Sequence, residues 1–119
     1  MVKKIRLAIV GSRSFNDYEK LVAEIEDEYG ECEIETIISG GARGADSLGA
    51  YFAKENAIPL VEHKAEWDKY GKSAGFRRNR TIISECTHCI AFWDGESHGT
   101  KHDIDLCKEM NKPCKVVLF

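Results

Sequence analysis

A glycine-rich segment is the part of this 119-residue chain with the clearest capacity to bind a ligand. Residues 39–46 read Ser-Gly-Gly-Ala-Arg-Gly-Ala-Asp, and the three glycines allow the backbone to approach a ligand closely. The amides that follow begin a predicted helix, whose N-terminus attracts anions. A tight turn from strand to helix explains the same glycines without a ligand. The segment matches neither the P-loop motif GxxxxGKS/T nor the dinucleotide motif GxGxxG.

A second loop of this kind, residues 94–100, ends in Gly99-Thr100. The hydroxyls of Ser97 and Thr100, with the amides beside them, can hold a second phosphate or a ribose hydroxyl. The alternative is an ordinary polar loop in which Thr100 caps a helix. Both interpretations stay open from the sequence.

Arginines stand beside both loops: Arg13 and Arg43, followed by the run Arg-Arg-Asn-Arg at residues 77–80. The planar guanidinium of arginine suits phosphate. Within the run, Arg78 and Asn79 are expected to meet the ligand, whereas the two outer arginines are expected on a solvated helix face.

An acid and an aromatic residue complete this set. Asp46, the first acid after the glycines, can orient a ribose, assist a water molecule or simply complement the positive end of a helix. Trp67 can stack on a base, although a loop tryptophan equally serves as a packing anchor. The sequence leaves these alternatives open.

Five cysteines stand at irregular spacing, which does not match a disulfide framework. Cys86-Thr-His-Cys89 has the CxxC spacing of metal and redox motifs, but zinc would need two further ligands from among His98, His102 and Cys107. Cys89 falls in a predicted buried strand. We therefore interpret both as buried, hydrophobic thiols and expect no metal site.

Alternating strand-like and helix-like segments must position these residues. The predicted strands are residues 5–10, 34–38, 59–62, 88–93 and 114–119, and the predicted helices are residues 17–29, 45–56, 74–85 and 100–111. The third helix is expected to use Phe76, Ile82 and Ile83 as its apolar residues. The alternation predicts an α/β fold, in which residues 1–119 form a single doubly wound domain with a five-stranded, mainly parallel sheet and helices on both faces. Ligands bind such sheets beyond the carboxyl ends of the strands, where these loops fall.

Composition narrows the classes of function. Apolar residues make up 43% and charged residues 31%, a globular balance that argues against disorder. No apolar run approaches the roughly 20 residues that span a bilayer, and the N-terminus lacks a signal-peptide core, so we expect a cytoplasmic protein without membrane contact. The net charge is −3, and residues 16–35 hold nine acids against one base. This balance disfavours a duplex-DNA binder but leaves room for a local anion site.

In their order along the chain, the motifs resemble the YspA-related branch of the SLOG superfamily. The resemblance rests on Gly11-Ser-Arg13, Gly40 to Asp46, Trp67 with Tyr70-Gly71, Ala74-Gly75, Arg78-Asn79, Ser97 and Gly99-Thr100. It implies a Rossmann-like fold and a nucleotide or nucleotide-derived ligand, such as NAD or an ADP-ribose-like molecule, with no further cofactor required. It implies ligand contacts for Gly11, Ser12, Arg13, Gly40, Gly41, Arg43, Gly44, Asp46, Arg78, Asn79, Ser97, Gly99 and Thr100. To these the binding interpretation adds Ala42, through its amide, and Trp67, over the base.

The resemblance also implies an alternative, enzymatic function. LOG phosphoribohydrolases of the same superfamily release a base from a nucleoside monophosphate. Arg78-Asn79 resembles their Arg-Lys pair and Gly99-Thr100 their Gly-Thr motif, but their paired glutamates would fall at His102 and Asp103. The alternative is therefore a nucleotide N-glycosidase in which Arg78 holds the phosphate or ribose and Asp46 or Asp103 acts on the glycosidic bond.

Nucleic acid and a second copy of the chain are the two macromolecular partners that the resemblance raises. A DNA-processing branch of the superfamily binds single strands, but the acidic segment 16–35 disfavours nucleic acid here. Homo-oligomers are common in the superfamily, so self-association is an expectation of the resemblance, and the sequence names no interface for it.

Overall fold

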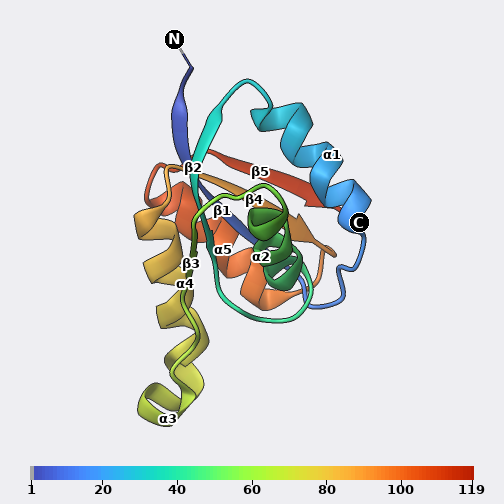
Figure 1. The fold of residues 1–119 in the computed structure, drawn as a ribbon. Coiled ribbons are helices and arrows are strands. Elements are labelled where there is room, and N and C mark those ends of the chain that lie inside the picture. Colours follow the sequence, from blue (N-terminus) through green and yellow to red (C-terminus); the bar gives the residue numbers. More distant parts are fainter. Residues whose placement is uncertain (1) are drawn as a thin grey trace.

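A computed structural model describes residues 2–119 (Figure 1). Its elements are β1 (Lys4–Gly11), α1 (Tyr18–Tyr29), β2 (Glu33–Ser39), α2 (Ala45–Glu55), β3 (Leu60–Glu62), α3 (Trp67–Tyr70), a 3-10 turn (Gly71–Ser73), α4 (Ala74–Glu85), β4 (His88–Trp93), α5 (His98–Glu109) and β5 (Cys114–Leu118). The strands pair in parallel throughout, in the order β3-β2-β1-β4-β5. The predicted α/β class is confirmed. Within residues 2–119, none of the helices is long and apolar enough to cross a membrane.

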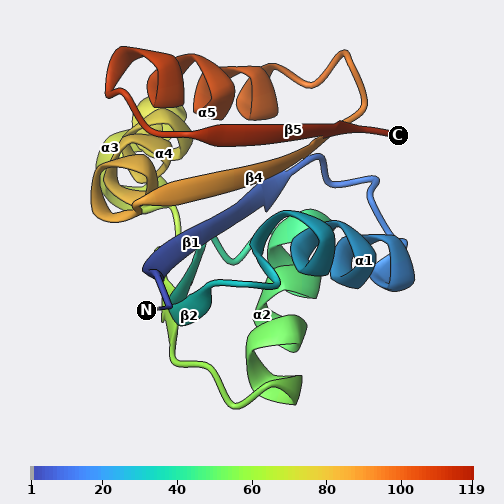
Figure 2. The same ribbon diagram turned by 90° about the horizontal axis from the view of Figure 1, so that it is seen from above.

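Helices cover both faces of the sheet (Figure 2). α1 and α2 pack on the face that carries Leu7, Ile9 and Phe92. α4 and α5 pack on the opposite face, with Ala8 and Ala91. Successive residues of a strand point to opposite sides, so the central strands β1 and β4 supply both hydrophobic cores. Such double coverage explains why both strands read as almost continuous apolar runs.

α1 shows how the sequence specifies a helix boundary. Asp17 caps its first turn, because the amide of Lys20 donates a hydrogen bond to Asp17 Oδ1 at 3.0 Å. Leu21, Ile25 and Tyr29 recur four residues apart and are all buried against the sheet. The acidic side chains of the helix lie off this buried face, and Glu26, Asp27 and Glu28 are exposed.

Two predicted details of the helices are wrong. α5 begins at His98, two residues earlier than predicted, because Ser97 caps it: the Thr100 amide donates to Ser97 Oγ at 3.5 Å. Phe76 is 53% exposed, and the centroid of its ring lies 4.5 Å from that of the His102 ring. It escapes burial because α3 and the start of α4 project beyond the sheet, as Figure 1 shows.

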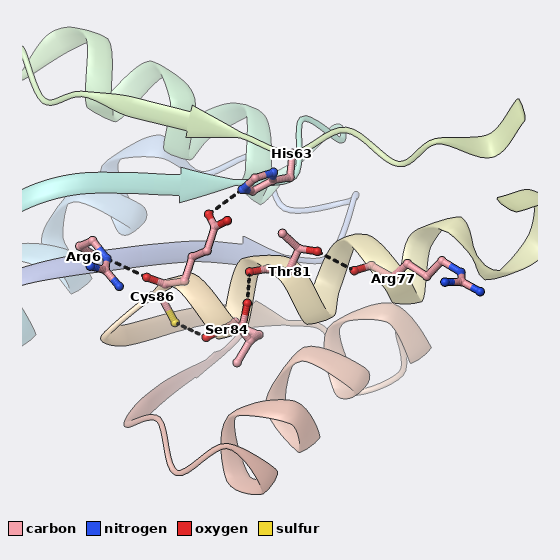
Figure 3. Close-up of polar contacts among 8 residues, drawn as sticks. Arg6, His63, Arg77, Thr81, Ser84 and Cys86 are labelled. Carbon is pink, nitrogen blue, oxygen red and sulfur yellow. Dashed lines mark hydrogen bonds and ion pairs between the residues drawn. The ribbon is translucent and has the colours of Figure 1, made fainter. Parts of the chain in front are cut away.

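The far end of α4 is tied to the sheet by polar contacts (Figure 3). His63, just after β3, donates from Nε2 to Glu85 Oε1 at 2.7 Å. Arg6 of β1 donates from Nε to the carbonyl oxygen of Glu85 at 2.7 Å. In the same half of α4, Ile82 and Ile83 are buried against the sheet. α4 is therefore fixed at its C-terminal half, while its first half reaches past the sheet edge.

Candidate functional site

The strand order reverses between β1 and β4, and a cavity lies at this point. The chain runs outward from β1 to β2 and β3, then returns to β4 on the other side of β1. The carboxyl ends of β1 and β4 meet here, which is where open α/β sheets bind ligands. The cavity measures about 440 Å³ and is lined by Val10, Gly11, Ser12, Arg13, Ser14, Ala42, Asp46, Arg78, Asn79, Ile82, Asp94, Ser97, Gly99, Thr100 and Asp103.

A second hollow of about 420 Å³ adjoins the cavity on the side of the glycine segment. Its lining is Arg13, Gly40, Gly41, Ala42, Arg43, Lys64, Ala65, Trp67 and Arg78. Arg13, Ala42 and Arg78 line both spaces, so the two form one site with two compartments. The predicted site residues thus line these two compartments, with one exception, Gly44.

Gly44 lines neither compartment and has a backbone role. Its φ is +77°, a conformation that favours glycine, and a Cβ atom there would lie 2.4 Å from the carbonyl oxygen of Ser12. The amide of Ala45 donates to the same Ser12 oxygen at 3.4 Å. Gly44 therefore allows the start of α2 to press against the loop after β1.

Arg78 is one of the three residues that line both compartments. Its Nη1 donates to the carbonyl oxygen of Gly40 at 2.8 Å, and its Nε donates to Asn79 Oδ1 at 3.0 Å. Gly40 has to be glycine for this approach, because a Cβ atom would lie 2.7 Å from both Arg78 Nη1 and Asp46 Oδ2. The guanidinium is thus held in one orientation before any ligand arrives.

Asn79 orients Arg78 from the side of α5. Its side chain is 6% exposed. While its oxygen accepts from Arg78, its nitrogen donates to the carbonyl oxygen of Gly99 at 3.4 Å and to Nδ1 of His102 at 3.2 Å. Asn79 therefore connects α4 to the first turn of α5. Lysine, which the LOG motif has at this position, would offer no acceptor to Arg78.

Small hydroxyl residues join the loop after β1 to the loop after β4. Ser12 Oγ lies 3.4 Å from Thr100 Oγ1 and accepts from the amide of Asp94 at 3.3 Å. Thr100 Oγ1 also lies 3.3 Å from Ser97 Oγ. Ser12 and Thr100 are each 2% exposed, so these hydroxyls form the floor of the cavity.

Asp94 is a lining residue that the sequence analysis did not single out. Its Oδ1 accepts from the amides of Glu96 and Ser97 at 2.9 and 2.7 Å, and these hydrogen bonds hold the pKa of its carboxyl below the ordinary value. The Asp-Gly pair after a strand was the available signal, since it marks a turn of this kind.

Two aspartates lie buried in the cavity. Asp46 is 6% exposed and Asp103 is 5% exposed. Burial raises the pKa of Asp46 to about 6, although the nearby charge of Arg78 and the amide of Ala42, which donates to Asp46 Oδ2 at 3.3 Å, oppose the increase. Burial, followed by the negative charge of Asp46, raises the pKa of Asp103 well above its ordinary value.

Asp103 also has an unpartnered polar atom. Within residues 2–119, its buried Oδ1 meets no hydrogen-bond partner, and neither aspartate forms an ion pair with Arg78 within 4.0 Å. An unsatisfied buried carboxylate oxygen is unfavourable in a folded protein, and such groups cluster at functional sites. The deep part of the cavity therefore offers hydrogen-bond acceptors to a ligand.

The rim of the site offers hydrogen-bond donors. The first turns of α2 and α5 open onto the cavity, and the leading amides of a helix have no partner within the helix. Arg13 and Arg43 are exposed at the edge, as is Trp67, which is 52% exposed. The site thus combines carboxylate acceptors inside with amide and guanidinium donors outside.

Comparison of the sequence with known proteins is consistent with this architecture. Residues 5–70 match the sequence profile of the YspA, cpYpsA-related SLOG family. The chain belongs to this SLOG family. It is also 35% identical, over 109 residues, to the Gene 61 protein of Mycobacterium phage D29, a match that covers 82% of this chain and 83% of the phage protein. No solved structure matches the chain at a significant level.

SLOG membership indicates nucleotide-related binding or processing as the general class of function. The profile match spans β1 to α3 and so includes the glycine segment and Asp46. Arg78, Asn79 and Asp103 lie beyond residue 70, outside the matched range. Their place in the site rests on the geometry described above.

Proposed function

We propose that this SLOG protein binds a phosphorylated nucleoside or another nucleotide derivative across the two compartments. The observation that carries the proposal is the fixed Arg78 guanidinium, which stands between a carboxylate-lined cavity and a glycine-lined hollow. A molecule with both anionic and hydroxyl groups complements such a site, because it needs donors at one end and acceptors at the other.

The rim suits the phosphate. The leading amides of α5 and α2 and the guanidinium groups of Arg13 and Arg78 supply positive partial or full charge. Arginine binds phosphate through two parallel hydrogen bonds, and helix N-termini add favourable electrostatics. These donors neutralise a phosphate without a metal ion.

The carboxylates suit a ribose. Hydroxyl groups of a sugar donate hydrogen bonds, and among residues 2–119 none donates to the buried Oδ1 of Asp103. A ribose hydroxyl at this atom would satisfy it and reduce the unfavourable effect of its burial. Asp46 offers a second acceptor beside it.

The second hollow suits the base. Trp67 presents an exposed aromatic ring beside Gly41 and Arg43. Stacking of a base on such a ring contributes about 1–3 kcal/mol and tolerates different bases. A ligand seated in this way would cover the ring that is now 52% exposed.

A thermal-shift screen of the purified full chain tests the proposal. The panel contains AMP, ADP, ATP, GTP, NAD, ADP-ribose, ribose 5-phosphate and a short single-stranded oligonucleotide. A compound at about 100 times its Kd stabilises the folded state by about 2.7 kcal/mol, which shifts the Tm of a domain of this size by roughly 10 °C. We expect such a shift for at least one nucleotide derivative. No shift with any of the nucleotides would contradict the proposal.

The oligonucleotide distinguishes a nucleic-acid binder from a nucleotide binder. Binding of a single strand depends strongly on salt, because it releases counterions. A shift with the oligonucleotide alone that disappears between roughly 50 and 200 mM salt would replace the present proposal.

The buried aspartate pair favours nucleotide N-glycosidase activity as a second candidate. Cleavage of an N-glycosidic bond needs a carboxylate that stabilises the oxocarbenium ion or activates water. Asp46 titrates near pH 6, so it can exchange a proton near neutral pH. If the chain releases a base from a nucleoside monophosphate, Asp46→Asn and Asp103→Asn should each abolish release, measured by chromatography, while Kd changes less than about tenfold. If both variants released the base as fast as the wild-type chain, this mechanism would be excluded.

A further inference from the structure

Three of the five cysteines converge in the core beneath α5. The sulfur atoms of Cys89, Cys107 and Cys114 all lie within 4.8 Å of one another. Cys89 and Cys107 are buried, and Cys114 is half-buried. They come from β4, α5 and β5, which lie side by side in Figure 2. Cys89 and Cys114 stand near the starts of their strands, at the sheet edge opposite the nucleotide site.

The fold dictates this convergence. Cys89 and Cys114 are register partners in the parallel strands β4 and β5, so both side chains leave the sheet on the same face. The last turns of α5 cover that face. The Lys112 amide donates to the carbonyl oxygen of Cys107 at 2.8 Å and so turns the chain from α5 back toward β5. Cys107 therefore faces the pair of strand cysteines.

The spacing of the sulfur atoms suits a single metal ion. A Zn–S bond is about 2.3 Å long, so two sulfur ligands of one ion lie roughly 3.8 Å apart. From separations of at most 4.8 Å, the side chains would have to close by no more than about 1 Å. Thiolates select soft ions such as Zn²⁺ over Mg²⁺ or Ca²⁺.

The surroundings favour a divalent ion. The neighbouring side chains in this core are apolar, among them Ala91, Leu106 and Met110. Three thiolates and a divalent ion leave one net negative charge, whereas a monovalent ion leaves two. Buried charge without a partner is strongly unfavourable, so the divalent ion, which leaves the smaller net charge, is preferred.

The other two cysteines lie outside this group. Cys86 donates from Sγ to the carbonyl oxygen of Ile83 at 3.3 Å, as Figure 3 shows. Cys32 packs against the core on the other face of the sheet. The CxxC pair noted in the sequence is therefore not the relevant cluster, and Cys114, which the sequence analysis did not consider as a ligand, belongs to it.

We propose that Cys89, Cys107 and Cys114 form a trithiolate site for a thiophilic divalent metal ion such as Zn²⁺. Binding releases the three thiol protons and forms three metal–sulfur bonds. A water molecule that enters past the half-buried Cys114 supplies the fourth ligand of a tetrahedral ion. The bound ion connects β4 and β5 to α5, the helix that carries Asp103 one turn before Cys107.

The test is a titration of the reduced full chain with Cd²⁺ under nitrogen, followed by competition with Zn²⁺. We expect one Cd²⁺ per chain, with an ultraviolet sulfur-to-cadmium charge-transfer band that Zn²⁺ abolishes. Cys114→Ser should weaken binding on the order of 100-fold, since it removes a direct ligand. Cys86→Ser and Cys32→Ser, the matched controls, should bind within about threefold of the wild-type chain.

Three results would overturn the proposal. The first is a wild-type chain that does not bind Cd²⁺ stoichiometrically, and the second is a Cys114→Ser variant that binds Cd²⁺ as tightly as the wild-type chain. The third is a mass of the native protein that is two hydrogens short, which would show that two of these thiols form a disulfide. Cys114 is half-buried, so its serine variant is the one expected to fold, and circular dichroism verifies this. Alkylation by iodoacetamide gives a second readout: Zn²⁺ should protect Cys114 from the reagent and leave Cys32 reactive.

Discussion

Arg78→Ala should weaken binding of the nucleotide identified in the thermal-shift panel on the order of 100-fold, whereas Arg77→Ala should change it less than about threefold. Arg78 is oriented by Gly40 and Asn79 at the junction of the two compartments. Truncation removes a charge-assisted contact to phosphate and leaves two buried carboxylates without a nearby cation. Isothermal titration calorimetry at two salt concentrations measures the effect.

Arg77 is a matched control because it has the same chemistry one residue away. Its guanidinium lies over the ring of Tyr70 at 4.3 Å, and its Nε donates to Ser73 Oγ at 3.1 Å, outside both compartments. Arg78→Lys adds a second comparison, since it keeps the charge and loses the planar pair of donors. If Arg78→Ala and Arg77→Ala weaken binding equally, the site is governed by general positive charge, and the role assigned to Arg78 is wrong.

Asp103→Asn should make the free protein more stable than the wild-type chain at pH 8, and equally stable near pH 4. In the wild-type chain, folding raises the pKa of this buried carboxyl, so the folded state disfavours its ionisation. An acid with a raised pKa gives full stability below its ordinary value of 3.8 and loses it as the pH rises toward the folded value. Asparagine does not ionise, so the variant escapes this loss.

Asp46 contributes to the same pH dependence. Its pKa rises from 3.8 to about 6, which corresponds to about 3 kcal/mol in total, lost as the pH rises from below 3.8 to above 6. Thermal unfolding followed by circular dichroism from pH 4 to pH 8 gives the profile for each chain. Asp105→Asn is the matched control, because Asp105 lies on the same helix in an exposed ion pair with Lys101 at 3.0 Å. That variant should change stability by less than about 1 kcal/mol. A destabilised Asp103→Asn at pH 8 would show that the carboxylate is satisfied in the folded chain.

The Asp103→Asn variant separates the contribution of this residue to stability from its contribution to ligand binding. A residue that destabilises the free protein yet is needed for its ligand is characteristic of a functional site. Removal of Asp103 should therefore raise the Tm of the free chain and reduce the further rise that the nucleotide gives. A residue with only a structural role would not move these two quantities in opposite directions.

The alternation of apolar periods was sufficient to predict the five strands, the four long helices and the class of fold, but not the short helix α3. The runs of β1 and β4 are almost continuously apolar because helices bury both faces of these strands, whereas the long helices show an amphipathic period. The same reasoning failed at Phe76, which has the apolar character of a core residue but lies where α4 projects past the sheet. Periodicity within one helix carries no information about where its neighbouring layer ends.

The site was predictable to the extent that loops at one sheet edge must meet. The glycine segment, Arg78 and Thr100 were assigned to the site for this reason. The burial of Asp103 was not predictable, because charged residues are usually exposed and the sequence does not reveal which helix face lies over the cavity. The convergence of Cys89 with Cys114 was also not predictable, since it depends on the register of β4 and β5.

The short helix α3 has a consequence for the kinetics of the site. It buries no side chain, and its first residue, Trp67, lines the second hollow. Segments with few buried contacts open locally with small free energies, so their amide hydrogens exchange with solvent long before those of β1 and β4. The side of the hollow that would cover a base is then expected to open locally more easily than the sheet. Arrival and departure of a ligand on that side can proceed by opening of α3 while the sheet and Arg78 stay in place, and a part of the binding free energy would be spent on ordering it.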